Sequence, residues 1–256
     1  MVIFGKSIGE VAELLLESKF CVVFTGAGVS AESGIPTFRG KNGLWSKYNP
    51  EEVASIEGFM RDPSKFWNLA KELIVKVKSK PNPAHYSIAR LEDMGIVKAV
   101  ITQNIDRLHQ KAGSKNVIEL HGSLEKVRCI RCGKEYKWEE IEEKLEHEMP
   151  PKCECGSIHL KPNIVFFNEP LDRDVLRKAF SLAERSDLFI VVGSSLVVYP
   201  AALIPLTAKD GGAKLVLINK DPTEMDYCFD IKIYGKAGEI LPEILRAVEI
   251  RKNRFS

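Results

Sequence analysis

The chain has 256 residues, 45% of them hydrophobic and 28% charged, and its formal net charge is +2. This composition excludes an intrinsically disordered chain, and the interspersed charges give no overall case for direct binding of nucleic acid. Residues 1–6 lack the layout of a signal peptide, and no apolar run approaches the roughly 20 residues that a membrane span needs. We therefore expect a globular, cytoplasmic, monomeric protein without a membrane partner.

The first predicted elements are a helix and a strand. Ser7-Ile8-Gly9-Glu10 matches a capping box, and apolar residues then recur at helical spacing. The apolar run Cys21–Thr25 predicts a buried strand, and Gly26-Ala27-Gly28-Val29-Ser30-Ala31 follows it directly. This is a Gly-x-Gly-x-x-Ala pattern, whose glycines permit a tight turn and a close approach of backbone N–H groups to a pyrophosphate. The alternative is a plain turn from a strand to a helix.

The residues after this turn depart from an ordinary dinucleotide-binding unit. Gly34 and Pro36 stop the helix after little more than one turn, so that Phe38 and Arg39 stand on a loop. We expect this loop to fold over whatever the glycines hold.

Three helices are predicted next. Residues 50–61 and 63–78 form two of them, which we assign to an insertion or lid beside the sheet. Asn82 and Pro83 provide the cap and the first turn of the third helix, and Gly95 ends it.

The rest of the chain alternates strands with helices. The predicted strands are residues 97–103, 117–120, 163–167, 188–192, 214–218 and 231–234, and the predicted helices are residues 173–184, 200–208 and 239–248. This alternation predicts a doubly wound, mostly parallel α/β sheet. Residues 124–161 differ in composition, and we interpret them as a separate module inserted between strands.

Five predicted strands end in small, amide or titratable residues. These are Thr25 and Gly26, Gln103, Asn104 and Asp106, His121, Gly193, Ser194 and Ser195, and Asn219. Because open parallel sheets bind ligands at the carboxyl ends of their strands, we expect one crevice that holds a whole dinucleotide. Its phosphates would lie at residues 26–28 and one ribose near Gln103 and His121. An acidic residue at the usual spacing is missing, so we assign the adenosine ribose to Asn219.

His121 is the candidate general base. It is the one titratable group of this set whose ordinary pKa lies near neutrality, and it follows a strand end opposite Asn104 and Asp106. Asp106 can in addition cap a short helix. The histidines that we interpret as surface or packing residues are His85, His109, His147 and His159.

Four of the six cysteines lie in two close pairs. Cys129-x-x-Cys132 and Cys153-x-Cys155 offer four thiolates, a ligand set that tetrahedral zinc accepts. Because the protein would fill all four positions, we predict one structural Zn²⁺ per chain, and a redox pair is the alternative. The cysteines interpreted as core residues are Cys21 and Cys228.

Together these motifs resemble those of the sirtuin family, in the same order and over nearly the whole chain. They are Gly26-Ala27-Gly28-Val29-Ser30, Ser33-Gly34-Ile35-Pro36, Phe38-Arg39-Gly40, Thr102-Gln103-Asn104-Ile105-Asp106, His121-Gly122, the four cysteines and Gly193-Ser194-Ser195-Leu196. The resemblance implies a Rossmann-like NAD-binding domain, comprising residues 1–40, 80–123 and 162–256. It implies a smaller domain made of the helical insertion, residues 41–79, and the zinc module, residues 124–161. The implied activity is that of an NAD-dependent protein lysine deacetylase, or deacylase.

The resemblance also implies roles for individual residues. His121 would be the catalytic base, Asn104 would orient the reactive ribose, and Phe38 would shield the reactive carbon from water. The other residues assigned to the NAD pocket are Gly26, Ala27, Gly28, Ser30, Glu32, Thr37, Arg39, Trp45, Gln103, Ile105, Asp106, Gly193, Ser194, Ser195, Asn219, Lys220 and Ala237. A substrate peptide carrying acetyl-lysine would add as a strand between two edges, namely Val165, Phe166 and Phe167, and Leu196, Val197 and Val198. The products would be nicotinamide, O-acetyl-ADP-ribose and deacetylated lysine.

Three residues depart from the family pattern. Thr37, Asn168 and Ser194 stand where aspartate, glycine and threonine are usual, and we expect activity to survive these changes. The stretch Ala70-Lys71-Glu72-Leu73 lacks the arginine of the desuccinylase branch, so we expect a neutral acyl group such as acetyl. An NAD-dependent protein mono-ADP-ribosyltransferase is the alternative function. An NAD-sensing module without chemistry and a hydride-transferring dehydrogenase are disfavoured.

Overall fold

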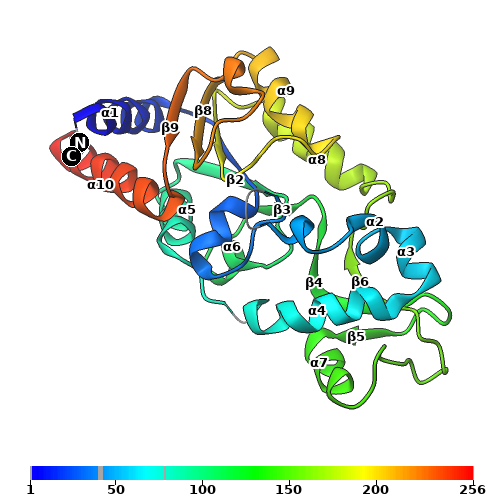
Figure 1. Cartoon of the computed structure of the whole chain (residues 1–256). Helices are drawn as coiled ribbons and strands as arrows, with labels where there is room; N and C mark the ends of the chain where they lie inside the picture. The colour runs from blue at the N-terminus through cyan, green and yellow to red at the C-terminus, as the bar shows by residue number, and fades with distance from the viewer. Residues whose placement is uncertain (1, 40–42, 78, 256) are drawn as a thin grey trace.

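A six-stranded parallel sheet forms the centre of the larger part of the molecule. The computed structural model describes residues 2–39, 43–77 and 79–255 (Figure 1). The strands of this sheet are β1 (Cys21–Thr25), β2 (Val97–Thr102), β3 (Val117–Glu119), β7 (Leu188–Val192), β8 (Lys214–Asn219) and β9 (Ile231–Tyr234). Their order is β3-β2-β1-β7-β8-β9, and every neighbouring pair is parallel. The prediction of a doubly wound parallel sheet is therefore confirmed.

The direction of strand addition reverses between β1 and β7. From β1 the chain adds β2 and β3 on one side, and it then returns to add β7, β8 and β9 on the other. This is the Rossmann order, which leaves a crevice outside the carboxyl ends of the two central strands. Thr25 at the end of β1 lies opposite Val192 at the end of β7, so both strands open into the same crevice.

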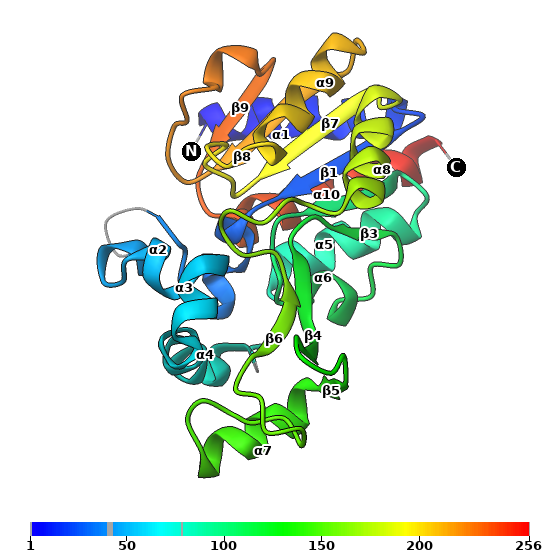
Figure 2. The ribbon, with the colours of Figure 1, turned by 90° about the vertical axis from the view of Figure 1, so that its right-hand side faces the viewer.

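Helices cover both faces of this sheet (Figures 1 and 2). The first face carries α1 (Val2–Glu17), α5 (Pro83–Asp93) and α10 (Ala237–Phe255), and the second carries α8 (Arg173–Glu184) and α9 (Ile204–Asp210). Alternate strand residues divide between the faces, with Val23 packed under the first group and Phe24 under the second. Full burial of such a side chain contributes about 1.5–3 kcal/mol. Burial on both faces explains why β1 is a continuous apolar run and does not alternate with polar residues.

A smaller antiparallel sheet forms the centre of the other part of the molecule. Its strands are β4 (Gly122–Cys129), β5 (Glu135–Lys137) and β6 (Leu160–Ile164), in the order β5-β4-β6. It shares an apolar core with helices α3 (Ile56–Arg61), α4 (Pro63–Val77) and α7 (Trp138–His147), which lie beside it in Figure 2. Helix α2 (Pro50–Val53) contacts α3 and α4. Trp67 of α4 is fully buried there, and its indole N–H donates to the Leu160 carbonyl at 3.2 Å. The helical insertion and the cysteine-containing segment thus pack around one core.

The remaining elements are short. They are α6 (Leu108–Lys111) and the 3₁₀ helices η1 (Ala27–Ser33), η2 (Leu44–Ser46), η3 (Ala201–Leu203) and η4 (Asp226–Cys228). Over the residues that the structure describes, no helix has the length and apolar character needed to cross a membrane.

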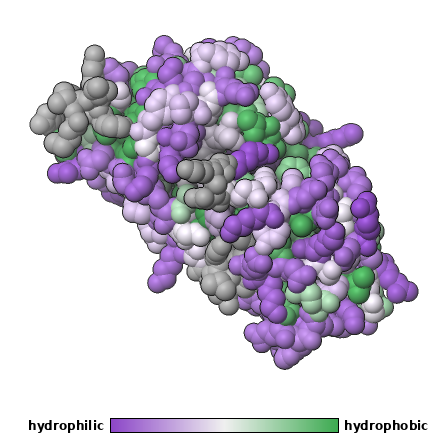
Figure 3. All heavy atoms as spheres, viewed as in Figure 1, coloured by the Kyte–Doolittle hydropathy of each residue, from purple (hydrophilic) through white to green (hydrophobic). Residues whose placement is uncertain are grey.

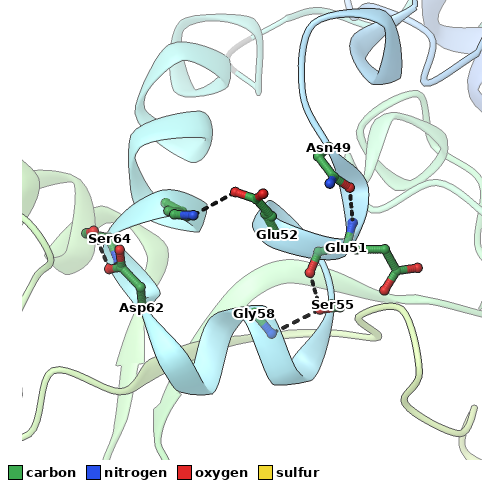
Figure 4. Close-up of polar contacts among 8 residues, drawn as sticks. Asn49, Glu51, Glu52, Ser55, Gly58, Asp62 and Ser64 are labelled. Carbon is green, nitrogen blue, oxygen red and sulfur yellow. Dashed lines mark hydrogen bonds and ion pairs between the residues drawn. The ribbon is translucent and has the colours of Figure 1, made fainter.

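Side-chain caps delimit the helices of the insertion (Figure 4). The Asn49 side-chain oxygen accepts from Glu51 N at 3.1 Å at the start of α2, and Ser55 Oγ accepts from Gly58 N at 3.0 Å at the start of α3. Such a cap contributes about 1 kcal/mol. The second cap falls within residues 50–61, which form two helices and not the single helix predicted.

The break between α2 and α3 connects the insertion to a segment far away in the sequence. The Ala54 carbonyl accepts from Phe167 N at 2.8 Å, and Ile56 N donates to the Phe167 carbonyl at 3.1 Å. A continuous helix would use both groups internally, so the two helices are separated by a contact that the local sequence does not show.

Other predicted boundaries also differ. Helix α1 begins at Val2, so Ser7 lies inside the helix and the predicted capping box is wrong. The strand predicted at residues 163–167 lies at 160–164 and pairs with β4 in the smaller sheet. In contrast, Asn82 caps α5 as predicted, because its side-chain oxygen accepts from Ala84 N at 2.9 Å. Gly40 and Lys78 belong to predicted segments but lie outside the described residues.

Candidate active site

The glycine turn after β1 is held directly against the end of β7. Gly26 N donates to the Val192 carbonyl at 3.0 Å, and Gly28 N donates to the Gly193 carbonyl at 2.8 Å. A Cβ on Gly28 would lie 2.7 Å from Gly193 Cα, and one on Gly193, whose φ is +62°, would lie 2.3 Å from Val29 N. Only glycines permit this contact. The turn therefore offers the close backbone approach that a pyrophosphate needs, although two of its N–H groups bond to β7.

The loop after η1 folds back on itself beside this turn. Trp45 N donates to the Phe38 carbonyl at 3.0 Å, and the two rings stack with their centroids 5.3 Å apart. Trp45 also meets Phe167 edge to face, at 5.8 Å between centroids. Trp45 thus connects Phe38, the predicted water shield, with one predicted edge of the peptide site. Thr37 Oγ1 donates to the Arg39 carbonyl at 2.9 Å within the same loop.

Asn104 lies against the glycine turn. Its Nδ2 donates to the Gly26 carbonyl and to Ser30 Oγ, both at 3.1 Å. Ser30 Oγ in turn donates to Asp106 Oδ2 at 2.7 Å, and Asp106 Oδ1 accepts from Leu108 N at 2.9 Å, the expected capping contact at the start of α6. Burial raises the pKa of Asp106, while the bonds from Leu108 and Ser30 act in the opposite direction. Three residues predicted for the pocket thus form one buried network.

Gln103 connects the candidate base with the end of β7. Its side-chain Nε2 donates to Ser194 Oγ at 2.9 Å, and its carbonyl lies 2.9 Å from His121 Nδ1. A carbonyl only accepts hydrogen bonds, so Nδ1 carries the proton and Nε2 keeps its lone pair. Burial lowers the pKa of His121, and this effect exceeds the opposite effect of the bond to Gln103. His121 is therefore neutral near pH 7 and can accept a proton at Nε2.

Two buried histidines support this network from the side of α5 and α6. His109 Nε2 lies 2.9 Å from Thr25 Oγ1, and the His109 ring packs against His85 at 4.9 Å. His85 Nε2 lies 3.4 Å from Ser30 Oγ. Burial lowers the pKa of His85 to about 4 and that of His109 to about 3. Both are packing residues, as interpreted, but no local pattern indicates that they also contact Thr25 and Ser30.

The resemblance places the adenosine half at Ser194, Ser195, Asn219 and Ala237; the two serines follow β7, Asn219 ends β8 and Ala237 opens α10. Glu32 Oε2 accepts from Gly238 N at 2.6 Å, next to Ala237, which opens α10. Asn219 Nδ2 donates to the Asp221 carbonyl at 2.7 Å. Glu32 and Ala237, which are far apart in the sequence, are therefore neighbours. The half-buried or exposed residues of the predicted pocket include Ala27, Ile105, Arg39, Ser195 and Lys220.

Some side chains and backbone groups of the two predicted peptide edges already make contacts within the protein. The Phe166 side chain is buried against Phe59, at 5.2 Å between ring centroids, and the Leu196 side chain is buried in the core beneath α8 and α9. A peptide can therefore meet only the backbone of these two residues. Val165 N donates to the His121 carbonyl at 2.9 Å, so a peptide strand here would bond mainly to carbonyls. Val197, on the other edge, is 41% exposed.

The four paired cysteines form one cluster. Their Sγ atoms all lie within 4.8 Å of one another, with Cys129 and Cys155 at 3.7 Å and Cys132 and Cys153 at 3.5 Å. A tetrahedral zinc ion with Zn–S distances of about 2.3 Å sets its sulfurs roughly 3.8 Å apart. The cluster therefore fits the structural Zn²⁺ predicted from the spacing.

Known proteins share both the sequence and this architecture. A model of the Sir2 family matches residues 26–200. NAD-dependent protein deacylase 2 of Archaeoglobus fulgidus is 57% identical over 243 residues, which cover 94% of this chain and 96% of that protein.

Two solved structures are similar over nearly their whole length. One, described as the structural basis for the mechanism and regulation of Sir2 enzymes, has a TM-score of 0.91 and 55% identity, with 96% of this chain and 99% of that chain covered. The other, of a Sir2 protein bound to a myristoylated histone peptide, has a TM-score of 0.87 and 49% identity, with coverage of 98% and 99%. The chain therefore belongs to the Sir2 family, the sirtuins.

Proposed function

We propose that the protein is an NAD-dependent protein lysine deacylase. The observation that carries this proposal is the hydrogen bond between His121 Nδ1 and the Gln103 carbonyl at 2.9 Å, which leaves Nε2 as a proton acceptor. Gln103 also donates a hydrogen bond to Ser194, so this one residue contacts both His121 and the segment that follows β7. The relative named NAD-dependent protein deacylase 2 and the Sir2 protein bound to a myristoylated histone peptide support the same activity.

NAD would bind across the carboxyl ends of β1, β2, β7 and β8. Residues 26–28 would hold the phosphates through their backbone. Gly26 and Gly28 keep this turn close to β7, because a Cβ on either would collide with Gly193. Glu32 and Ala237 would flank the adenosine half at the start of α10. NAD supplies the ADP-ribose that accepts the acyl group, and nicotinamide is its leaving group.

His121 and Asn104 would act on the ribose at the other end. His121 accepts the proton of the ribose hydroxyl at Nε2, and its lowered pKa keeps the imidazole in the basic form at neutral pH. Asn104 uses its Nδ2 for Gly26 and Ser30, so its amide oxygen is the atom that orients the ribose. These two bonds fix the amide before substrate binds.

Phe38 would exclude water from the reacting carbon. The Phe38 ring stacks on Trp45, and Trp45 in turn contacts the Phe167 ring edge to face. A rigid aromatic cover of this kind prevents hydrolysis of a reactive intermediate.

We propose that the acyl group is neutral. In the stretch Ala70-Lys71-Glu72-Leu73, Lys71 Nζ donates to the Leu145 carbonyl at 2.8 Å, and Glu72 accepts from Tyr48 Oη at 2.6 Å. Lys71 is thus bonded to a carbonyl and Glu72 carries a negative charge, so these two residues would not provide a counterion for a succinyl carboxylate. Acetyl and longer apolar acyl groups fit better.

The zinc site would be structural. The four cysteines fill a tetrahedral shell, so no position is left for water or substrate. Because zinc binds reduced thiolates, we also propose a reducing compartment, the cytoplasm, as the place of action.

Mass spectrometry of the products tests this proposal. NAD and an acetyl-lysine peptide should give nicotinamide, deacetylated peptide and O-acetyl-ADP-ribose in equal amounts. Protein-bound ADP-ribose without O-acetyl-ADP-ribose would instead assign the protein as a mono-ADP-ribosyltransferase.

A further inference from the structure

The outward face of the small sheet gathers positive charge. Val127, Cys129 and Leu160 face the core, whereas the alternate residues of these strands face outward. The charged residues that face outward include Lys126 and Arg128 of β4, Glu135 and Lys137 of β5, and Lys161 of β6. Arg128 lies directly opposite Glu135 of β5, whose carboxylate bonds to Lys126 instead. The other two charged pairs of this register, Lys126 with Lys137 and Arg128 with Lys161, set one cation against another. Such pairs destabilise a sheet, so the fold alone does not account for them.

Arg128 on this face and Arg131 in the turn after β4 form no ion pair within the described residues. Lys126 lies 3.0 Å from Glu135, and Lys161 lies 3.0 Å from Glu169. Arg128 and Arg131 are both exposed, and neither forms an ion pair with a carboxylate in residues 2–39, 43–77 or 79–255. The Arg131 guanidinium donates to the Cys155 carbonyl at 3.4 Å. Their charge is therefore available to an external anion.

The two arginines border a hollow of about 540 Å³. Its lining also includes Ile130 and the β6 residues from Lys161 to Asn163. Asn163 is two residues before Val165, the start of one proposed peptide edge. In an extended chain, the four steps from Lys161 to Val165 span about 14 Å. In the view of Figure 3, hydrophilic residues dominate the surface of the part of the molecule that contains this sheet.

We propose that this hollow, the Arg128–Arg131 hollow, binds an acidic segment of the protein substrate on one side of the acyl-lysine. The proposal rests on the proposed deacylase function, because the acyl-lysine itself is placed by the site at His121. Guanidinium groups bind carboxylates with two parallel hydrogen bonds, which suits Asp and Glu side chains. Among the described residues that line the hollow, none has an aromatic ring on which a base could stack, which favours a peptide over a single-stranded nucleic acid.

Steady-state kinetics on three acetyl-lysine peptides tests this inference. One peptide has neutral flanks, one has four glutamates placed three to six residues before the acetyl-lysine, and one has them after it. Two exposed ion pairs, one for each arginine, would strengthen binding of the acidic peptide by roughly two- to thirtyfold. We expect one acidic peptide to show a KM lower by that factor, with kcat unchanged. The gain should disappear in high salt, which shortens the screening length to about 3 Å at 1 M.

The variants test whether the lower KM depends on the arginines of this hollow or on any positive charge of the same face. Arg128→Gln should remove most of the gain, and Arg128→Glu should make the acidic peptide worse than the neutral one. Lys126→Gln is the matched control, since it removes one cation of the same face that is already paired with Glu135. Arg131→Gln is a second variant, and its zinc content is measured because Arg131 lies between two cysteine ligands.

Several results would overturn the inference. It fails if both acidic peptides match the neutral one, or if Lys126→Gln loses the gain as fully as Arg128→Gln. It fails as well if single-stranded DNA displaces a fluorescein-labelled acidic peptide at lower concentration than the unlabelled peptide does. Turnover of the neutral peptide reports on the deacylase function independently. If no peptide is turned over, anisotropy of the labelled peptide with wild-type protein and Arg128→Gln still decides whether the hollow binds it.

Discussion

Replacing Gly193 by alanine tests the contact between the glycine turn and β7. Gly193 has a φ of +62°, and a Cβ there would lie 2.3 Å from Val29 N and 2.6 Å from the carbonyl carbon of Gly28. Alanine in the left-handed region costs roughly 1 kcal/mol. The overlap forces backbone on both sides to move, which costs about a further 1–3 kcal/mol. We therefore expect Gly193→Ala to lower the free energy of unfolding by about 2–4 kcal/mol.

Gly212→Ala is the matched control for this experiment. Gly212 has a φ of +91°, but nothing lies within 4 Å of its hypothetical Cβ, so alanine there meets only the conformational cost. In a chain of this size each kcal/mol lowers Tm by about 2–4 °C. Thermal unfolding should therefore show a drop of about 2–4 °C for the control and of about 4–16 °C for Gly193→Ala.

Binding of NAD provides the second readout of the same pair of variants. Gly193→Ala should raise the KM for NAD, because the displaced turn no longer approaches the pyrophosphate, whereas Gly212→Ala should leave it unchanged. Equal Tm values for the two variants, together with an unchanged KM, would refute the close contact between the glycine turn and β7.

Three further predictions concern the base, the metal and the buried histidines. His121→Ala should lower kcat about 10²- to 10⁴-fold, while calorimetry should show that the variant still binds NAD. In the wild type, the acid limb of the pH–rate profile should lie below pH 6.5, because burial lowers the pKa of His121. Full activity of His121→Ala would contradict the role of His121 as the base. Cys153→Ser should reduce the bound zinc, measured by elemental analysis, and should lower Tm. A wild-type protein that contains no metal and has the same Tm as Cys153→Ser would contradict the zinc site. His85 and His109 are neutral in the folded protein, with pKa values of about 4 and about 3, so the unfolded chain binds more protons than the folded one below about pH 6.5. Stability should therefore fall with decreasing pH, by about 2 kcal/mol for each histidine at pH 5, and urea unfolding of His109→Gln should show a weaker pH dependence; an unchanged dependence would contradict the neutral buried state.

The features predicted correctly from the sequence depend on local chemistry. Cys21–Thr25 is buried on both faces, and a continuous apolar run predicts such a strand by itself. Asn82 caps α5 through Ala84 N, a contact between residues two apart. The cysteine pairs likewise carry their spacing in the sequence, although their meeting across the module does not follow from either pair alone.

The features missed depend on partners that are distant in the sequence. β6 contains Pro162 and gains its hydrogen bonds from β4, so its local pattern was weaker than that of the apolar run that follows it. Phe166 in that run packs in the small core instead of lying in a strand of the main sheet. The break before Ile56 exists because Phe167 bonds there. His109 became part of the site only because the topology placed α6 beside the end of β1.

A crystal structure with carba-NAD and an acetyl-lysine peptide tests most directly whether His121 faces the ribose of the bound dinucleotide. We predict that His121 Nε2 lies about 2.6–3.2 Å from a ribose hydroxyl while Nδ1 still bonds to the Gln103 carbonyl. An imidazole turned away from the ribose, or a dinucleotide bound outside the crevice between the glycine turn and Ser194, would contradict the proposed mechanism.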